Sequence, residues 1–307
     1  MSNTKLKITL ADFQNRKFEI RKEDFIYYIN NPNFYSRWEN VLYSTVKIRL
    51  LYYLKHKLPR LLKTASFKNN IFLLGFGKKS INSEEYIKDI LNSSGKLKRQ
   101  NIIVVLGKGD YEITDEFADE VPNNIKLIYA NNINTENPRF RYLPMGRDFR
   151  SSALFSKIKP TYKKDCLCYC NYSISTHSQR EELYNSIKDK QFIEFEHMGK
   201  FLDYSMSRRD FYNKVSKSKF TICPRGNGID TFRFWDSIYL GAIPIVVKEA
   251  VFHDYLYDLP ILFLDSYEDF AKLNRKFLEE NYQNMLRKKY NYNKLLLSYW
   301  INEIESC

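Results

Sequence analysis

Residues 219–247 read KFTICPRGNGIDTFRFWDSIYLGAIPIVV. The apolar run 220–223 predicts a strand, and the turn after it contains Gly226 and Gly228. A helix is expected at 231–240 because its apolar residues recur at helical spacing. A glycine-bearing turn that leads into a helix N-terminus offers unsatisfied backbone N–H groups, and the helix dipole adds positive charge there. The stretch therefore predicts an anion-binding site suited to phosphate.

Charged side chains surround the same turn. Arg225 and Arg233 add positive charge, and a guanidinium can hold phosphate through two parallel hydrogen bonds. Asp230 or Thr231 is expected as the N-cap of the helix. Asp236 lies three residues after Arg233 on the same helix face, where it is expected to accept hydrogen bonds from ribose hydroxyls. In the plainer interpretation, Asp230 only caps the helix, and Arg233 and Asp236 form a surface ion pair.

A second strand, loop and helix precede this stretch. The run 166–172 predicts a strand, and Arg180 lies at the start of the helix expected at 178–187. The carboxyl ends of parallel strands meet at one edge of a sheet, so this loop should lie beside the glycine-bearing turn. Arg180 is therefore expected as a second diphosphate contact, whereas His177 is expected to make a hydrogen bond at the helix start.

Strands and helices alternate along most of the chain. Strands are expected at 70–75, 101–107, 126–130, 166–172, 191–195, 220–223, 243–247 and 261–264, and helices at 83–92, 178–187, 207–216, 231–240 and from 266 onward. Such alternation predicts parallel sheets covered by helices. The polar stretch 151–164 separates the alternation into two halves. The fold class is thus α/β, with two Rossmann-like domains facing a central cleft.

Three domain ranges follow from this pattern. Residues 1–150 are expected to form an N-terminal, acceptor-side Rossmann-like domain that begins with a mostly helical segment at 1–66. Residues 165–280 are expected to form the C-terminal nucleotide-binding domain, and 281–307 a C-terminal helix. In the helix expected at 38–62 the basic residues do not gather on one face, which favours packing against the domain over contact with a membrane surface.

The central stretch resembles a known family. The residues that carry the resemblance, in chain order, are Ser218-Lys219-Phe220, Cys223-Pro224-Arg225-Gly226, Asp230-Thr231, Arg233, Asp236 and the run 240–246, LGAIPIV. Together they look like the exostosin-like glycosyltransferases, glycosyltransferase family 47. The resemblance covers residues 165–265, and the first 140 residues match only in general layout. The family usually has Glu at the position of Asp236, so the shorter acid here is expected to shift the ribose contact.

The resemblance implies a GT-B-type fold and inverting, metal-independent transfer of a sugar to a hydroxyl of a glycan acceptor. The donor is expected to be a nucleotide-diphosphate sugar, a UDP-sugar first, and no cofactor or metal is expected beside it. No Asp-x-Asp motif ends an expected strand. The expected substrate-binding residues are Arg180, Arg225, Gly226, Gly228, Asp230, Thr231, Arg233 and Asp236. A GDP-sugar such as GDP-fucose remains an alternative donor, since a fold does not determine a substrate.

The base that takes the proton of the acceptor hydroxyl is expected from the N-terminal half. Asp110 follows the strand expected at 101–107, and Asp148 lies in a Gly-Arg-Asp sequence near the domain junction. Either carboxylate can serve as a general base. Either is equally suited to a turn or a helix cap.

The composition indicates which other functions and partners stay open. The chain of 307 residues has a net charge of +13, and its first 70 residues contain 14 Lys and Arg against 5 Asp and Glu. Such a surface favours anionic partners, so a nucleic-acid-binding protein is the alternative from another class, although no recognised nucleic-acid motif is present. Peripheral membrane contact through the basic N-terminal region also stays open, and the oligomeric state does not follow from the sequence.

The compartment is expected to be cytoplasmic. No apolar stretch is long enough for a transmembrane helix, and the first residues lack the apolar core of a signal peptide. The five cysteines include the alternating Cys166, Cys168 and Cys170, whose spacing does not suit a zinc site and whose thiols are expected to be reduced. Because related enzymes of the secretory pathway carry an anchor, these features indicate a bacterial or viral enzyme.

Overall fold

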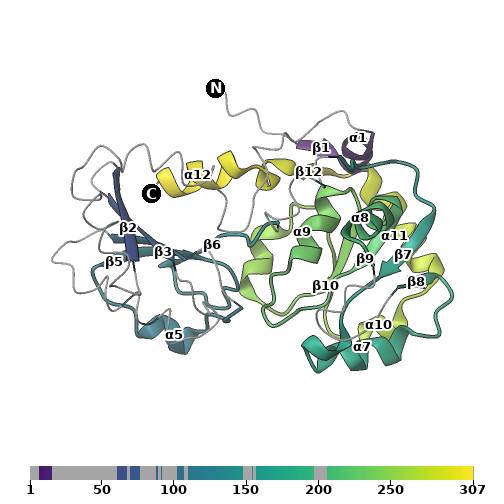
Figure 1. The fold of residues 1–307 in the computed structure, drawn as a ribbon, viewed down its shortest axis with the longest axis horizontal. Helices are drawn as coiled ribbons and strands as arrows, with labels where there is room; N and C mark the ends of the chain where they lie inside the picture. The colour runs from purple at the N-terminus through teal and green to yellow at the C-terminus, as the bar shows by residue number, and fades with distance from the viewer. Residues whose placement is uncertain are drawn as a thin grey trace. The chain divides into compact units, whose positions relative to one another are not determined.

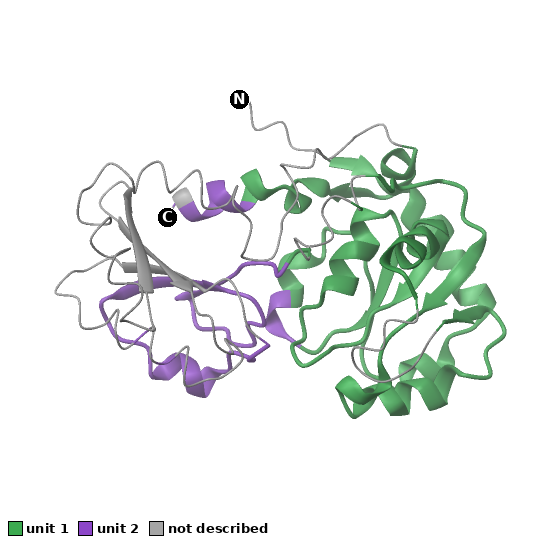
Figure 2. Ribbon diagram, in the orientation of Figure 1, with its two compact units in different colours: residues 1–26, 146–249, 253–299 green, residues 27–145, 250–252, 300–307 purple. Residues whose placement is uncertain are grey.

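A computed structural model of the chain describes residues 7–15, 61–67, 70–76, 88, 91, 102–106, 110–147, 154, 157–196 and 206–306. For 61–67, 70–76 and 102–106 it describes the backbone alone. The chain divides into two compact units, coloured separately in Figure 2. Unit 1 comprises residues 1–26, 146–249 and 253–299, and unit 2 comprises 27–145, 250–252 and 300–307. Both units are therefore discontinuous in sequence, and the N-terminal residues 1–26 belong to the unit that contains the glycine-bearing turn.

Unit 1 is built on a parallel sheet of five strands (Figure 1). In the order in which they pair, the strands are β11 (Leu262–Leu264), β10 (Ile243–Val247), β9 (Ser218–Ile222), β7 (Cys166–Cys170) and β8 (Ile193–Phe195). Each pairing is parallel, as the alternation of strands and helices predicted. All five residues of β7 and of β10 are buried, which explains their continuous apolar sequences.

The strand order of unit 1 reverses between β7 and β9. From β7 the chain adds β8 on one side, and then β9, β10 and β11 on the other. The loops that follow β7 and β9 therefore leave the sheet on either side of a topological switch point. In open α/β sheets, ligands bind at the carboxyl ends of the strands at this point.

Helices cover the sheet of unit 1. Those wholly within unit 1 are α1 (Leu10–Gln14), α7 (Gln179–Ile187), α8 (Arg208–Lys217), α9 (Phe232–Tyr239), α10 (Asp269–Lys272) and α11 (Arg275–Arg287), with short 3-10 helices at η3 (Ile174–Thr176) and η5 (Tyr292–Leu295). α8 packs on β7 and β9 and beside α9, and α9 packs on β10 (Figure 1). Trp235 and Ile238 of α9 are fully buried, so the apolar face of this helix is part of the core. The 3-10 helix η4 (Val251–Leu256) and α12 (Leu297–Glu305) contain residues of both units.

The N-terminal segment is part of unit 1. β1 (Lys7–Thr9) pairs antiparallel with β12 (Lys289–Asn291). Gln14 donates a hydrogen bond of 2.7 Å from Nε2 to the carbonyl oxygen of Gly241. Gly241 has a φ of +74°, and a Cβ atom there would lie 3.2 Å from Gln14 Cγ, so glycine suits both the backbone and the close approach of the N-terminal helix.

Two sequence expectations are corrected here. Residues 1–66 were expected to be mostly helical; α1 is a helix, but β1 and the first residues of β2 (Leu61–Phe67) are strands. Residues 16–60, with nearly all of the helix expected at 38–62, lie outside the described residues. Residues 281–307 were expected to form one helix, but α11 ends at Arg287 and β12 separates it from α12. β1 and β12 form strands because each is the distant partner of the other, and helical periodicity within a short window carries no information about such a partner. β2 instead pairs with β3, the strand that follows it in the chain.

Unit 2 contains a second sheet of five strands. Its order is β2, β3 (Asn70–Phe76), β4 (Ile102–Leu106), β5 (Ile125–Ala130) and β6 (Phe140–Tyr142). The pairings from β3 to β6 are parallel, whereas β2 pairs antiparallel with β3. The expected strands at 70–75, 101–107 and 126–130 are thus confirmed.

The described core of unit 2 combines aliphatic residues such as Ile125 and Ile128 with aromatic pairs. Phe117 of α5 (Asp115–Asp119) and Phe140 of β6 meet edge-on with ring centroids 6.4 Å apart. Tyr142 stacks on Phe252 at 4.7 Å, which joins the short insertion 250–252 to this unit. The helix expected at 83–92 lies mostly outside the described residues, and its described residues Lys88 and Leu91 are helical.

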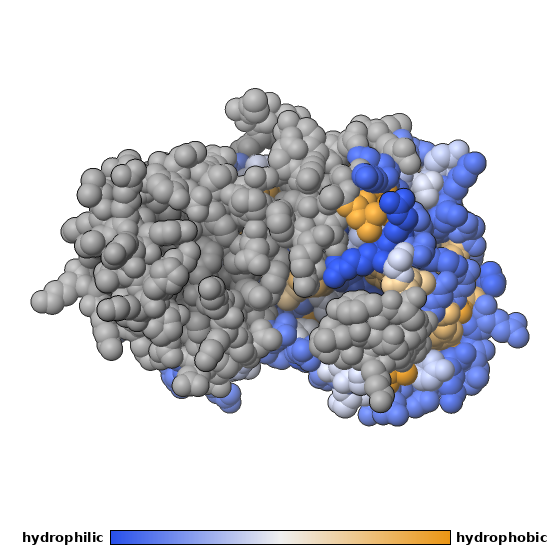
Figure 3. All heavy atoms as spheres, viewed as in Figure 1, coloured by the Kyte–Doolittle hydropathy of each residue, from blue (hydrophilic) through white to orange (hydrophobic). Residues whose placement is uncertain are grey.

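The described surface is hydrophilic for the most part. Figure 3 shows apolar side chains only in small separate groups on the described part of the visible face. The exposed large hydrophobic residues among those described are Tyr162, Tyr255, Tyr257 and Phe277. None of the helices within the described ranges is long and apolar enough to cross a membrane.

Candidate functional site

The glycine-bearing loop, residues 224–231, leads from β9 to α9 at the switch point of unit 1. Gly226 donates its backbone N–H to the carbonyl oxygen of Gly228 at 2.8 Å, which closes a tight turn. Both glycines are buried, whereas Asn227 at the tip is exposed. The turn that we predicted here from the sequence is thus confirmed.

Thr231 is the N-cap of α9. Its side-chain oxygen accepts a hydrogen bond of 3.4 Å from the backbone N–H of Phe234. Asp230, the other candidate for the cap, instead accepts a hydrogen bond of 2.8 Å from the indole nitrogen of Trp235. Asp230 is 4 % exposed. Its carboxylate therefore joins the loop to the buried face of the helix.

Arg180 lies beside the loop, as the sequence predicted, but its donors bind backbone carbonyls. Nε donates to the carbonyl oxygen of Arg225 at 2.6 Å, Nη1 to that of Ser173 at 2.9 Å and Nη2 to that of Pro224 at 3.5 Å. This one buried side chain thus connects the loop after β7 with the loop after β9. Burial and the nearby charge of Arg233 lower the pKa of Arg180 to about 10.

Arg225 is held by the carboxylate of Glu249, a residue that was not predicted from the sequence as part of the site. Its Nη1 lies 3.6 Å from Oε2 of Glu249. Tyr267 donates a long hydrogen bond of 3.5 Å to the other oxygen of Glu249. Glu249 comes two residues after β10, the strand next to β9, so it lies at the same carboxyl edge of the sheet. Its position after a buried strand was the available sequence signal.

Arg233 has few interactions among the described residues. Its guanidinium carbon lies 5.8 Å from the ring centroid of Phe211, a cation–π contact, and its side chain is half-buried. Its Nε is buried and has no hydrogen-bond partner within the described part of the chain. Arg233 occurs in the first turn of α9, next to the N–H groups of the helix N-terminus.

Asp236 does not pair with Arg233. Its Oδ1 accepts a hydrogen bond of 2.9 Å from Nε of Arg147, and the side chains are 0 % exposed for Arg147 and 7 % for Asp236. Burial raises the pKa of Asp236, and the guanidinium of Arg147 opposes that shift. The surface ion pair considered from the sequence is therefore absent. The sequence did not identify Arg147 as a site residue, because no local pattern links it to α9, which comes much later in the chain.

The loop after β7 adds two polar side chains. The hydroxyl of Thr176 is buried without a hydrogen-bond partner in the described residues, and its methyl carbon is 3.9 Å from the place where a Cβ of Gly226 would lie. His177 accepts a 3.4 Å hydrogen bond at Nδ1 from the backbone N–H of Gln179, as expected for a residue at a helix start. Burial, followed by the charges of Arg225 and Arg180, lowers the pKa of His177.

The structure describes only one of the two candidates for the catalytic base. Asp110 belongs to unit 2 and is partly exposed. Asp148 lies outside the described residues. The role of each as a base stays a prediction, as do the donor-binding roles of the arginines and of Asp236.

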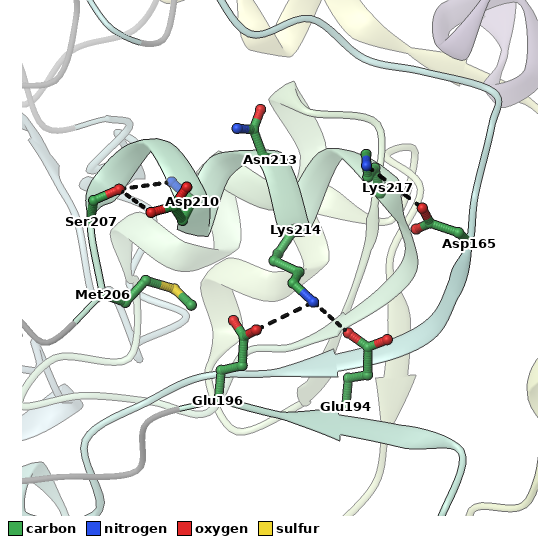
Figure 4. A pocket seen from close by; sticks show the side chains of 9 residues that line it. All are labelled: Asp165, Glu194, Glu196, Met206, Ser207, Asp210, Asn213, Lys214 and Lys217. Carbon is green, nitrogen blue, oxygen red and sulfur yellow. Dashed lines mark hydrogen bonds and ion pairs between the residues drawn. The ribbon is translucent and has the colours of Figure 1, made fainter.

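A separate pocket of about 720 Å³ is lined by residues of α8 and of the end of β8 (Figure 4). Its lining contains four carboxylates and two lysines, and both lysines are paired with carboxylates. Lys214 forms salt bridges with Glu194 at 3.1 Å and with Glu196 at 3.3 Å. The hydroxyl of Ser207 donates a hydrogen bond to the carboxylate of Asp210 at the start of α8. None of its lining residues belongs to the glycine-bearing loop.

The described cysteines do not form a metal site. Cys166, Cys168, Cys170 and Cys223 are buried free thiols. Burial raises the pKa of each. In the part of the chain that the structure describes, no group of three or more His, Cys, Asp or Glu side chains is arranged to hold a metal ion.

Residues 147–303 match the protein-family model described as the RXYLT1 C-terminal domain. The match covers more than half of the chain and contains both loops at the switch point. The protein is thus a glycosyltransferase of the exostosin-like type, as the resemblance of its sequence indicated. It belongs to the RXYLT1 C-terminal domain family.

A search of curated proteins found no significant match. A solved structure titled "Crystal Structure of alpha1,3-Fucosyltransferase" is similar over 67 % of this chain and 74 % of that chain, at 13 % identity and a TM-score of 0.41. A TM-score of this size carries no argument about the fold or the donor.

Proposed function

We propose that the protein transfers a sugar from a nucleotide-diphosphate donor, a UDP-sugar, to a hydroxyl of a glycan acceptor, with inversion and without a metal ion. The observation that carries the proposal is the gathering of Arg180, Arg225 and Arg233 around one glycine-bearing loop at the switch point. Like charges repel, so such a cluster is favourable when an anion binds between them. A diphosphate has the charge and the size for this place.

The three arginines have different roles in this proposal. Arg180 holds the two loops together through backbone carbonyls, and Arg225 is placed by Glu249. Arg233 is left to contact the diphosphate, together with the positive end of the helix dipole at the first turn of α9. Arginine suits this role because its planar fork can form two parallel hydrogen bonds with phosphate oxygens.

The same groups can assist the chemical step. When the acceptor oxygen attacks the anomeric carbon from the face opposite the diphosphate, the bond from that carbon to the phosphate oxygen breaks and negative charge grows on the leaving group. Arg233 and the helix N-terminus would stabilise that charge more strongly in the transition state than in the bound donor. The proton of the acceptor hydroxyl passes to a general base, for which Asp110 and Asp148 are the candidates. In this proposal the two units form a GT-B-type enzyme with the acceptor on the side of unit 2.

Binding of nucleoside diphosphates tests the proposal. We expect calorimetry to detect UDP binding that persists in the presence of a chelator, and GDP is measured alongside because a GDP-sugar is the alternative donor. A screen of nucleotide sugars for slow donor hydrolysis then identifies the sugar. Binding that disappears when metal is removed would contradict the metal-independent part. An oligonucleotide that raises the melting temperature while neither nucleotide does so would favour the nucleic-acid-binding alternative.

A further inference from the structure

The side chain of Arg147 connects three segments of unit 1. Arg147 itself follows Gly146, the first residue of the second segment of this unit. Its guanidinium carbon lies 5.7 Å from the ring centroid of Tyr212 on α8 and 5.6 Å from that of Tyr239 on α9. Its Nε donates to Asp236 on α9 at 2.9 Å, and Arg147 has no exposed surface. A charged group is thus enclosed between two helices and held in one orientation.

Stability alone does not account for this arrangement. Removing two charges from water is costly, and well-packed hydrophobic residues often stabilise a core as much as a buried ion pair or more. A buried pair of this kind specifies geometry instead, because the flat guanidinium and the carboxylate must meet in one relative orientation. Only one rotation of α9 about its axis brings Asp236 to Nε of Arg147.

That rotation also determines where Arg233 points. Asp236 lies three residues after Arg233, so the two occupy neighbouring positions on one helix face. α9 has only eight residues, Phe232–Tyr239, and a change in its rotation would move the whole first turn. A contact at Asp236 is therefore carried directly to the guanidinium of Arg233.

We propose that Arg147 and Asp236 form a positioning pair that orients α9 so that Arg233 faces the diphosphate of the donor. The inference rests on the proposed function, and it gives Asp236 a different role from the ribose acceptor expected from the sequence. Asp236 is 5 % exposed and already accepts a hydrogen bond from Arg147. In this arrangement the carboxylate acts on the helix, and through the helix on Arg233.

Inorganic pyrophosphate and UDP separate the two roles of Asp236, because pyrophosphate has no ribose. The variant is R147M/D236L, which removes both charges and replaces each side chain with an apolar one of comparable shape. We expect its affinity for UDP and for pyrophosphate to fall by about the same factor, roughly tenfold, which corresponds to about 1.4 kcal/mol. If UDP binding falls and pyrophosphate binding is unchanged, Asp236 contacts the ribose and the inference is wrong.

A second measurement asks whether the pair acts through Arg233. On an Arg233→Ala background, R147M/D236L should change UDP affinity less than twofold, because the group it positions is gone. Equal losses on both backgrounds would show that the pair acts independently and would overturn the inference. The control is K219M/E279L, which removes another ion pair of unit 1, between β9 and α11, and should leave UDP affinity unchanged.

The outcomes also distinguish this inference from the proposed function. If the wild-type protein binds neither UDP nor GDP, the proposed function fails and this inference fails with it. If the wild type binds a nucleotide and R147M/D236L binds it equally well with an intact fold, only the inference fails. Circular dichroism and the melting temperature of R147M/D236L establish that the fold is intact.

Discussion

Two helices of unit 1, α7 and α9, begin at the same edge of the sheet, and each has an arginine in its first turns. Arg180 of α7 gives its three nitrogens to the carbonyl oxygens of Ser173, Pro224 and Arg225. Arg233 of α9 has one ring contact, and its Nε has no hydrogen-bond partner among the described residues. The same residue type at equivalent places therefore serves two ends. Arg180 connects the two loops, and Arg233 is the residue that we propose contacts the ligand.

The difference comes from the number of backbone carbonyls within reach. A buried guanidinium must find acceptors for its N–H groups, and a loop that turns around it supplies them. At α9 several carbonyl groups of the loop already have donors: those of Pro224 and Arg225 accept from Arg180, that of Gly228 accepts from Gly226 N–H, and that of Thr231 accepts from Trp235 N–H. An arginine beside a helix N-terminus is thus a ligand contact only when the backbone does not already satisfy it.

The largest expected effect in this comparison is on stability, at Arg180. Arg180→Met keeps most of the side-chain volume but leaves three carbonyl groups without their donor. We expect a loss of about 2–4 kcal/mol of unfolding free energy, because each buried group left unsatisfied costs roughly 1–3 kcal/mol and not every group stays dry. Urea denaturation measures it, and Arg180→Lys should recover part of the loss. An unchanged stability with lost UDP binding would return Arg180 to the role of a direct diphosphate contact.

A smaller effect, confined to the donor, is expected at Arg233. Arg233→Ala should weaken UDP binding by about 1.5–3 kcal/mol, the usual value of a charge-assisted hydrogen bond, and should lower turnover further than binding. Its unfolding free energy should change by less than about 1 kcal/mol. The matched control is Arg275→Ala, an exposed arginine at the start of α11. If Arg233→Ala and Arg275→Ala bind UDP alike, the donor site is not at α9.

The smallest expected effect is electrostatic, at His177. Burial and the charges of Arg225 and Arg180 lower its pKa in the free protein. A bound diphosphate would offset those charges, so we expect UDP to raise the pKa of His177 toward or above its usual value. Because the bound form then holds a proton more readily, UDP affinity should rise as the pH falls between the free and bound pKa values.

Histidine NMR titrations with and without UDP measure this shift, and His177→Gln assigns the signal among the four histidines. The variant Asp110→Asn provides a comparison outside unit 1 and should leave the shift intact. A pKa that does not move when UDP is bound would mean that the anion binds away from the two loops.

Some features of the site were accessible from local sequence. The strand at 218–222, the glycine turn and the helix at 232–239 follow from patterns that span only a few residues, and the sequence located all three. Parallel pairing also followed, since the alternation of strands and helices constrains the connections. The same constraint predicted that Arg180 lies beside the glycine-bearing loop, which the structure confirms.

The partners of these side chains were decided by the tertiary structure. Asp236 pairs with Arg147, and Arg180 bonds carbonyls of a loop more than 40 residues away in the chain. The N-terminal strand β1 pairs with β12 near the other end of the chain. Backbone periodicity and turn chemistry act between neighbours in sequence, so the sequence by itself determined most of the elements around the site and their order, but not the strands β1, β2 and β12. Which polar groups meet depends on how those elements pack, because burial forces each group to find whichever partner the packing brings within hydrogen-bond distance.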